Sequence, residues 1–250
     1  MANATPAVPN TNRALIVVTS VAEFPASAGE HAGRATGFYM DEMAGPYFAL
    51  TDAGYDVTIA SVAGGEPPID PSSLGENGNR KPTVQRFLDD ADAMAKLRDT
   101  PAVGTLDPTA YAAVFLPGGH GTMWDFRRSA DLARLVGSAW DNGAVVSAVC
   151  HGPAGLIEAV DADGEPIVKG RRVNSFTDAE EAAVGLTGTV PFLVETELRE
   201  KGGRFENTGN FGSHVAVDGR LVTGQNPASV AAVGEAIVAA LADGRIAEAA

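Results

Sequence analysis

The sequence predicts an α/β protein in which a mostly parallel sheet carries helices on both faces. Three observations support this fold class. Short apolar runs rich in valine and alanine, typical of buried strands, recur along the chain, and segments with helical patterns separate them. A strand, a helix and a strand follow one another within residues 13–61, as in a βαβ unit. One apolar run ends directly at Cys150, with Gly152 and Pro153 close behind. This is the layout of a nucleophile elbow, so we expect a flavodoxin-like sandwich that contains one.

The first half of the chain contains three of the expected strands, at residues 13–20, 55–61 and 111–116. Thr36 can cap a helix that ends at Gly54, and Pro46 is expected to kink or restart this helix. A second helix is expected over residues 83–98. Residues 62–82 form a long loop rich in glycine and proline, and a loop of this length is usually functional or part of an interface.

In the second half, residues 144–149 form the strand before the elbow, and a helix over residues 129–140 precedes it. Two short extended pieces, a hairpin and three helices complete the pattern. They are expected at residues 166–169 and 171–174, at 214–217 with 220–223, and in helices that begin near Thr177, Val190 and Asn226. We find no repeat or linker. The prediction is therefore one domain over residues 13–250, preceded by a disordered tail at residues 1–12 and ending loosely after Gly244.

The charge balance excludes several classes of partner. The chain has 32 acidic and 18 basic residues, a net charge of −14, whereas nucleic acids and anionic membranes both require a positive face. A single cysteine cannot form an intramolecular disulfide, which favours a reducing, cytoplasmic location. No apolar run approaches the ~20 residues of a membrane span, and the first twelve residues lack the features of a signal peptide.

Cys150 is the candidate nucleophile. It is the only cysteine of the chain, and it is expected at the carboxyl end of a strand and the amino end of a helix. The partial positive charge of a helix amino end stabilises a thiolate, so we expect a depressed pKa for this thiol. A buried, inert cysteine is the alternative, but that role would not need His151 beside it or Gly152 directly after.

The elbow also predicts where an oxyanion would bind. The amide of His151 follows the nucleophile, and a second amide is expected from Gly119, in the glycine turn after the third strand. The sequence alone does not identify the residue that acts as the general base. Its candidates are Asp41, Glu42, Asp178, Glu180 and Glu181. Glu42 has apolar neighbours that can raise the pKa of its carboxyl. We expect His31, His120 and His214 to be structural or exposed, and no histidine pair has metal-ligand spacing.

Several motifs resemble those of the PfpI superfamily, also called the parkinsonism-protein family, within the class I glutamine amidotransferase-like fold. The similarity is to its small heat-shock, glyoxalase III-like branch, and it spans nearly the whole chain. The motifs are TGFYMDE (36–42), LPGGHGTMWD (116–125), AVCHGPAGL (148–156), FTDAEE (176–181), PFLVETELREKGG (191–203) and GRLVTGQNPAS (219–229).

This resemblance implies a nucleophilic Cys150, an active-site His151 and a protonated Glu42 that hydrogen-bonds the sulfur. It places the third triad acid at Glu181, although a shift in the alignment by a few residues would place it at Asp178 or Glu180. It places the oxyanion amides at Gly119 and His151. It further implies glutathione-independent conversion of methylglyoxal, a small 2-oxoaldehyde, to lactate. The implied protein is a homodimer that needs no metal or organic cofactor.

Four other functions compete with this hypothesis. A glutamine amidotransferase needs a distant His-x-Glu pair, and none of the four histidines has glutamate two residues later. A cysteine peptidase needs an open groove, whereas the long loops favour a roofed pocket. A protein deglycase would use the same residues. A holdase chaperone or oxidative stress protein would not depend on turnover at Cys150.

Overall fold

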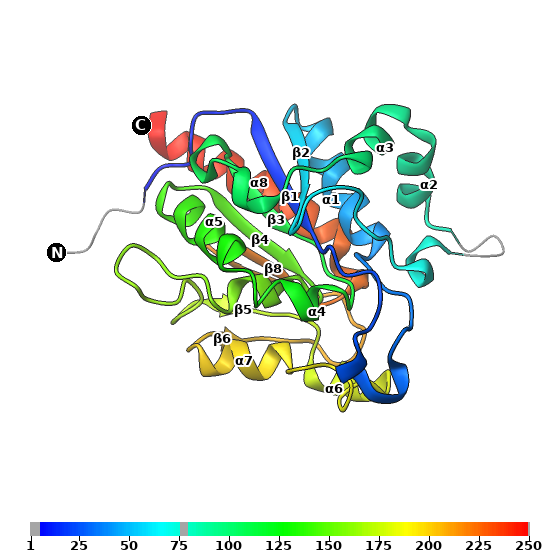
Figure 1. Ribbon diagram of the computed structural model, residues 1–250. Coiled ribbons are helices and arrows are strands. Elements are labelled where there is room, and N and C mark those ends of the chain that lie inside the picture. Colours follow the sequence, from blue (N-terminus) through cyan, green and yellow to red (C-terminus); the bar gives the residue numbers. More distant parts are fainter. Residues whose placement is uncertain (1–5, 76–79, 250) are drawn as a thin grey trace.

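A six-stranded sheet forms the centre of the protein (Figure 1). The computed structural model describes residues 6–75 and 80–249. The strands run in the order β2-β1-β3-β4-β8-β7, and neighbours are parallel except for the β7–β8 hairpin. Their bounds are Arg13–Val18 (β1), Asp56–Ser61 (β2), Ala113–Leu116 (β3), Val145–Val149 (β4), Val215–Asp218 (β7) and Leu221–Gly224 (β8). The predicted flavodoxin-like fold and the predicted hairpin are confirmed.

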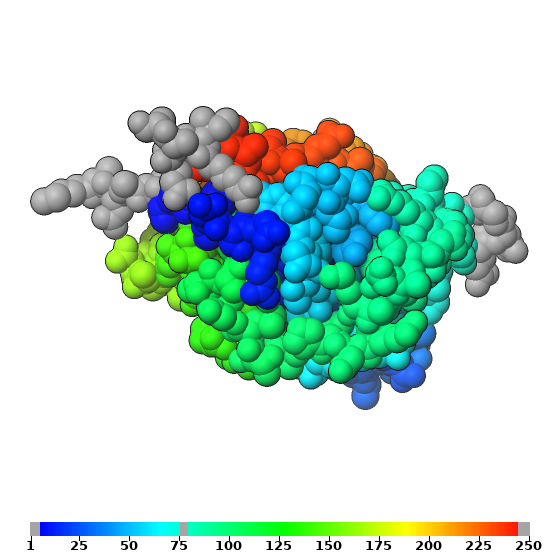
Figure 2. Space-filling model, turned by 90° about the horizontal axis from the view of Figure 1, so that it is seen from above, coloured from blue at the N-terminus to red at the C-terminus, as the bar shows by residue number. Residues whose placement is uncertain are grey.

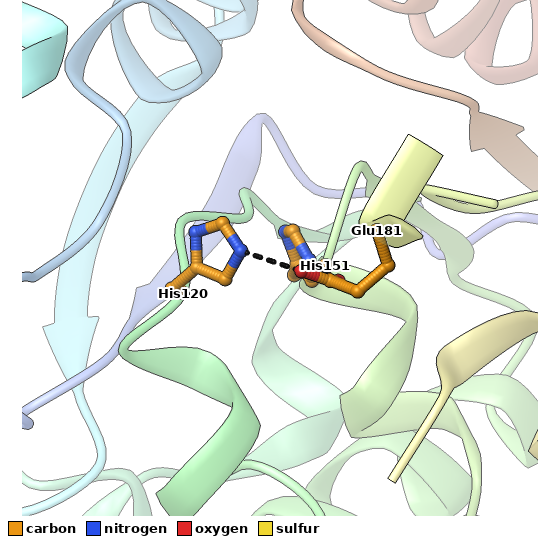
Figure 3. A group of neighbouring side chains, drawn as sticks. All are labelled: His120, His151 and Glu181. Carbon is orange, nitrogen blue, oxygen red and sulfur yellow. Dashed lines mark hydrogen bonds and ion pairs between the residues drawn. The ribbon is translucent and has the colours of Figure 1, made fainter. Parts of the chain in front are cut away.

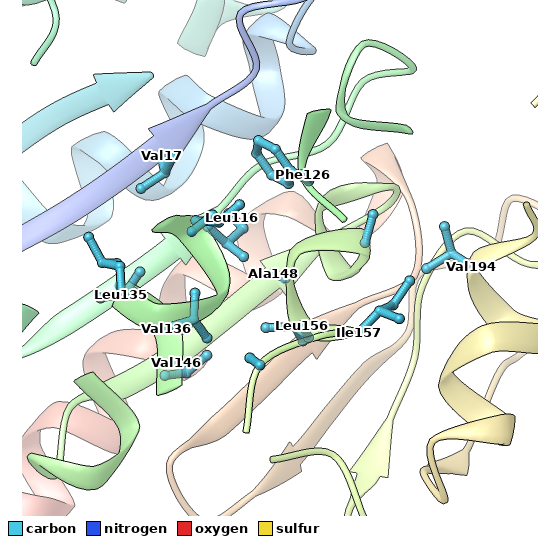
Figure 4. Close-up of a cluster of buried hydrophobic side chains, with 14 of the residues drawn as sticks. Val17, Leu116, Phe126, Leu135, Val136, Val146, Ala148, Leu156, Ile157 and Val194 are labelled. Carbon is cyan, nitrogen blue, oxygen red and sulfur yellow. The ribbon is translucent and has the colours of Figure 1, made fainter. Parts of the chain in front are cut away.

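The central strands contribute to two cores because successive side chains point to opposite faces of a sheet. On one face, Leu116, Val146 and Ala148 pack with Leu135 and Val136 of α5 (Ala130–Asp141), as Figure 4 shows. The other face is covered by α1 (Met40–Asp52) and α8 (Val230–Ala249), which pack against each other. Strands covered on both sides explain why the sequence shows continuous apolar runs rather than alternation.

Two helices differ from the prediction at their ends. α1 begins at Met40, because the hydroxyl of Thr36 donates to Asp70 instead of capping a helix, and Pro46 lies within α1 without ending it. The expected helix over residues 83–98 is two helices, α2 (Pro82–Asp89) and α3 (Ala91–Arg98). The break arises at Asp90, whose carboxylate accepts hydrogen bonds from the first amides of α3.

A second, two-stranded sheet lies beside the main one. β5 (Arg172–Val173) pairs in parallel with β6 (Arg204–Phe205), a strand that the sequence pattern did not predict. The remaining helices are α4 (Thr122–Asp125), α6 (Asp178–Ala183) and α7 (Val194–Glu200). Short 3₁₀ segments cover Ala26–His31, Pro71–Leu74, Val103–Thr105, Pro108–Ala110, Gly152–Leu156 and Pro227–Ser229.

The first and last described segments of the chain, drawn in blue and red, lie close together (Figures 1 and 2). Of the expected tail, residues 1–5 lie outside the described residues, but Val8 is only 1% exposed and contacts Gly244 of α8. The helix continues to Ala249, beyond the expected end. Residues Pro227–Gly244 have the length and composition of a membrane span. However, Val233 and Ile237 of this segment are fully buried in the core, as expected of a core helix in a globular domain.

Candidate active site

Cys150 lies at a sharp turn at the carboxyl end of β4. Its φ is +60°, a value that residues other than glycine rarely adopt. The turn is held on both sides, because the Cys150 amide donates to the carbonyl of Gly224 (2.9 Å) and its carbonyl accepts from the amide of Phe176 (2.8 Å). A strained nucleophile between a strand and a helical turn is the geometry of a nucleophile elbow.

Two glycines let the turn after β3 approach this elbow closely. A Cβ atom on Gly152 would lie 2.0 Å from the carbonyl oxygen of Leu116. A Cβ atom on Gly118 would lie 2.6 Å from the amide nitrogen of His151 and 2.8 Å from Oε2 of Glu42. Side chains at these two positions would force the two turns apart. The turn at Pro117–Gly121 can lie against the elbow only because Gly118 and Gly152 have no side chain.

The expected depression of the Cys150 pKa is contradicted by its surroundings. The residue is 4% exposed, and burial raises the pKa of the thiol well above its usual value. Negative charge on Glu42 raises it further, whereas the amide of His151 lowers it. In place of the expected helix, the elbow is followed by the five-residue 3₁₀ segment Gly152–Leu156, whose dipole is too short to outweigh burial.

His151 and Glu181 continue from the sulfur as a chain of contacts. Nδ1 of His151 lies 3.3 Å from Sγ of Cys150, and its Nε2 lies 2.7 Å from Oε2 of Glu181. Although burial alone would raise the pKa of Glu181, His151 and His120 hold it well below its usual value. Glu181 is therefore a carboxylate that can orient the imidazole and stabilise its protonated form.

The other two acids of this segment point elsewhere. Asp178 accepts a hydrogen bond from the hydroxyl of Thr196. Glu180 is fully buried and accepts from the amides of Thr177 and Phe211. Of the three alternatives that the sequence left open, only Glu181 contacts an imidazole.

A second histidine joins the same carboxylate (Figure 3). Nε2 of His120 lies 3.0 Å from Oε1 of Glu181, and the rings of His120 and His151 have centroids 4.2 Å apart. Burial, followed by the nearby His151, lowers the pKa of His120, so its ring is neutral at pH 7. We had expected His120 to be structural or exposed. Its place directly after Gly119 in the glycine turn is the sequence signal that would have marked it.

The three residues also meet a simple geometric condition for binding a metal ion. The candidate ligand atoms of His120, His151 and Glu181 all lie within 4.8 Å of one another, although their sequence spacing predicts no metal site. Two imidazole nitrogens and a carboxylate oxygen are ligands that zinc accepts. Here the carboxylate oxygens hydrogen-bond both Nε2 atoms, so the three groups satisfy one another directly.

Glu42 reaches the sulfur from the first turn of α1. Its carboxyl is fully buried, and Oε2 accepts a hydrogen bond of 2.9 Å from the amide of Gly118. Burial raises the pKa of Glu42 to about 8, even though hydrogen bonding with Cys150 and Gly118 lowers it. The carboxyl is thus mostly protonated at pH 7 and can donate to sulfur. The neighbouring Asp41 instead pairs with Lys81, at 2.5 Å.

Three donors face the space above Cys150. Within residues 6–75 and 80–249, the amides of Gly119 and His151 donate to no protein oxygen, and the His151 amide interacts with the sulfur of Cys150. The oxyanion role predicted for these two amides stays a prediction. Tyr39, which the sequence analysis did not single out, also lines this space. Burial raises the pKa of Tyr39 to about 12, and the charges of Glu42 and Cys150 add to this effect. Its phenol therefore stays protonated as a hydrogen-bond donor.

Cys150 and His151 line a cavity of about 270 Å³. Its lining is Phe24, Arg34, Tyr39, Asp70, Ser72, Gly119, His120, Cys150, His151, Phe176, Val184, Leu186, Phe211 and Pro227. His31 and His214 are not part of this lining, in agreement with the structural or exposed role expected of them. A cavity of this volume suits a small molecule better than an extended peptide.

Comparison with known proteins gives consistent results. Residues 35–240 match the DJ-1/PfpI family. Glyoxalase 3 from Candida albicans is 32% identical over 216 residues, which cover 83% of this chain and 91% of the relative. A crystal structure of glyoxalase III from the same organism superposes with a TM-score of 0.81 at 29% identity, covering 91% of this chain and 96% of that one.

Two further relatives carry different activities in their names. Glutathione-independent glyoxalase HSP31 from Saccharomyces cerevisiae is 30% identical over 207 residues, covering 79% of this chain and 86% of the relative. Protein/nucleic acid deglycase HchA from Pseudomonas aeruginosa is 31% identical over 200 residues, covering 77% of this chain and 68% of the relative.

Proposed function

Because the chain belongs to the DJ-1/PfpI family, we propose that it is a glutathione-independent glyoxalase that converts methylglyoxal and related 2-oxoaldehydes to 2-hydroxy acids. The observation that carries this proposal is the contact chain from Cys150 through His151 to Glu181, with a neutral carboxyl at Glu42 on the other side of the sulfur. The names of the relatives from Candida albicans and Saccharomyces cerevisiae support the same activity.

The first step is addition of sulfur to the aldehyde carbon. Nδ1 of His151, 3.3 Å from Sγ, accepts the thiol proton, and Glu181 stabilises the imidazolium that results. This proton transfer is needed because the buried thiol is not ionised on its own. The new C–S bond gives a hemithioacetal, whose oxygen the amides of Gly119 and His151 can bind.

The second step moves a proton between the two carbons of the substrate. His151 or Glu42 first gives its proton to the hemithioacetal oxygen and so becomes a base. This base then removes the proton from the carbon bound to sulfur and returns it to the adjacent carbon through an enediol. The oxygen on the first carbon gives its proton back as the thioester forms. Tyr39 and His120 line the same cavity and can hydrogen-bond the second oxygen of the substrate. Water then cleaves the thioester to give the 2-hydroxy acid and free Cys150. The side chains around the cavity supply the nucleophile and the proton transfers for each step.

The direct test is turnover of methylglyoxal and glyoxal by the purified protein in the absence of glutathione. We expect loss of the 2-oxoaldehyde and stoichiometric appearance of lactate from methylglyoxal, measured by chromatography. Loss of methylglyoxal without lactate would contradict the proposal, because it would indicate adduct formation with the protein rather than catalysis.

Glu181→Gln should lower kcat by ~10²-fold or more, since an uncharged amide cannot stabilise the imidazolium of His151. Asp178→Asn is the matched control on the same helix, because Asp178 contacts Thr196 and not an imidazole. Initial rates of lactate formation check both variants. If Glu181→Gln left the rate unchanged and Asp178→Asn lowered it, the assignment of the third acid to Glu181 would be wrong.

A protein deglycase is the second candidate, and the similarity to HchA from Pseudomonas aeruginosa favours it over the remaining alternatives. A purified methylglyoxal adduct of a lysine peptide distinguishes the two activities. Release of the unmodified peptide faster than the adduct decomposes unaided would support deglycation. A homodimer and a cytoplasmic location stay predictions, and light scattering tests the former.

A further inference from the structure

The cavity above Cys150 has much more apolar wall than a methyl substituent can contact. Its reacting groups, Cys150, His151 and the amide of Gly119, occupy only one part of the lining. The apolar part of the wall consists of Phe24, Phe176, Val184, Leu186, Phe211 and Pro227. An apolar surface beside a few placed polar groups is typical of sites that bind an apolar part of their ligand.

Aromatic rings extend from the imidazole toward solvent. The centroids of His151 and Phe176 lie 4.7 Å apart, and those of Phe176 and Phe211 lie 6.2 Å apart. His151 is 1% exposed, Phe176 is 7% exposed and Phe211 is 50% exposed. The row of rings therefore begins at the reacting groups and ends at the mouth of the cavity, within reach of a large substituent on a substrate held at Cys150.

Phe211 is held at this mouth by a buried carboxylate. Its φ is +60°, and its amide donates a hydrogen bond of 2.6 Å to Oε1 of Glu180. The same carboxylate accepts from the side-chain amides of Gln225 and Asn226, so it fixes the loop that carries Phe211. A half-exposed phenylalanine gains little from its own burial. Strained backbone that is held so firmly is a common feature of binding and catalytic sites.

We propose that Phe211, Phe176 and the aliphatic wall beside them form a subsite for an aryl group, and that the protein prefers aryl 2-oxoaldehydes such as phenylglyoxal to methylglyoxal. This inference rests on the proposed glyoxalase function. Sulfur of Cys150 bonds to the aldehyde carbon of phenylglyoxal, a proton moves from that carbon to the ketone carbon, and water cleaves the C–S bond. The product is mandelate. The aldehyde carbon is oxidised and the ketone carbon reduced by the same amount, so water is the only co-reactant.

The test compares kcat/KM for phenylglyoxal and methylglyoxal in the wild type and in Phe211→Ala. We expect a wild-type ratio of at least ~10 in favour of phenylglyoxal, and a fall of the ratio by ~10-fold in the variant. Phe211→Gly also removes the ring and permits positive φ, so a similar fall there separates the ring from backbone strain. Val217→Ala is the control, because Val217 is 40% exposed but is not part of the cavity lining.

Initial rates of mandelate formation are measured, because phenylglyoxal also modifies arginine and Arg34 lines the cavity. Turnover of methylglyoxal with a ratio near or below one, or a ratio that survives both Phe211 variants, would overturn the aryl subsite alone. Absence of turnover with either substrate would instead refute the proposed function. A change of oligomeric mass in Phe211→Ala, with the ratio preserved, would assign the ring to a subunit interface and also overturn the subsite.

Discussion

Cys150→Ser abolishes turnover of methylglyoxal, with an expected loss of ~10⁴-fold or more. A serine hydroxyl is far less acidic than a thiol. Transfer of its proton to His151, which lies 3.3 Å from the present sulfur, is therefore much less favourable and leaves a weaker nucleophile for the aldehyde. The loss should appear in both lactate formation and aldehyde consumption. The remaining rate should equal that of methylglyoxal in buffer with an inert protein at the same concentration.

The variant is a clean test because the site changes little otherwise. Serine is close to cysteine in size, and the strained φ of +60° is set by hydrogen bonds of the backbone to Gly224 and Phe176. Circular dichroism and the melting temperature should therefore match the wild type. Cys150→Ala provides a second variant without a hydroxyl. Turnover above a tenth of the wild-type rate in either variant would mean that another group forms the covalent bond or that none does.

The sharp turn at Cys150 could be predicted because the signal is local. An apolar run, a cysteine and a glycine within a few residues specify a strand that ends in a tight turn, and parallel strands end at a common edge. That rule also predicted that Gly119 lies beside His151. The close approach of Gly118 and Gly152 to neighbouring backbone shows why the glycines are needed there.

The choice among Asp178, Glu180 and Glu181 could not be made from helix periodicity alone. Adjacent residues of a helix differ by about 100° in direction, and which of them faces the imidazole depends on how α6 docks. One clue was present in the sequence. Thr177 and Glu180 form a capping box, with each side chain bonded to the backbone of the other, and this pattern already assigns Glu180 to the helix start.

Long-range contacts account for most of what the sequence analysis missed. His120 meets Glu181 across 61 positions of sequence, and no local pattern indicates that pairing. β5 and β6 have two residues each, too few for a strand signal. The pKa of Cys150 was misjudged because small residues after the elbow suggested a full helix, whereas only a 3₁₀ segment forms around a fully buried sulfur.

Glu42→Gln should lower kcat by ~10²–10⁴-fold, the usual contribution of a general acid-base group. Glutamine keeps the size of the side chain, an oxygen that can accept from the amide of Gly118, and a donor toward sulfur. It cannot lend a proton and take it back during enediol formation. The loss should therefore fall on kcat rather than KM, as measured by initial rates over a range of methylglyoxal concentrations.

The pH dependence gives this prediction a sign that a merely structural role would not produce. The neutral carboxyl of Glu42 is the form that donates to sulfur and lends a proton, and burial raises the pKa of Glu42 to about 8. Wild-type kcat/KM should therefore fall as the pH rises through about 8, and Glu42→Gln should lack this fall. In Glu42→Gln the neighbouring negative charge is gone, and that charge is one cause of the raised pKa of Cys150. The ultraviolet absorbance of the thiolate should then appear at lower pH in the variant, even though turnover falls. A variant that turns over methylglyoxal at the wild-type rate would leave His151 or water to move the proton and reduce Glu42 to a neighbour that packs against the sulfur.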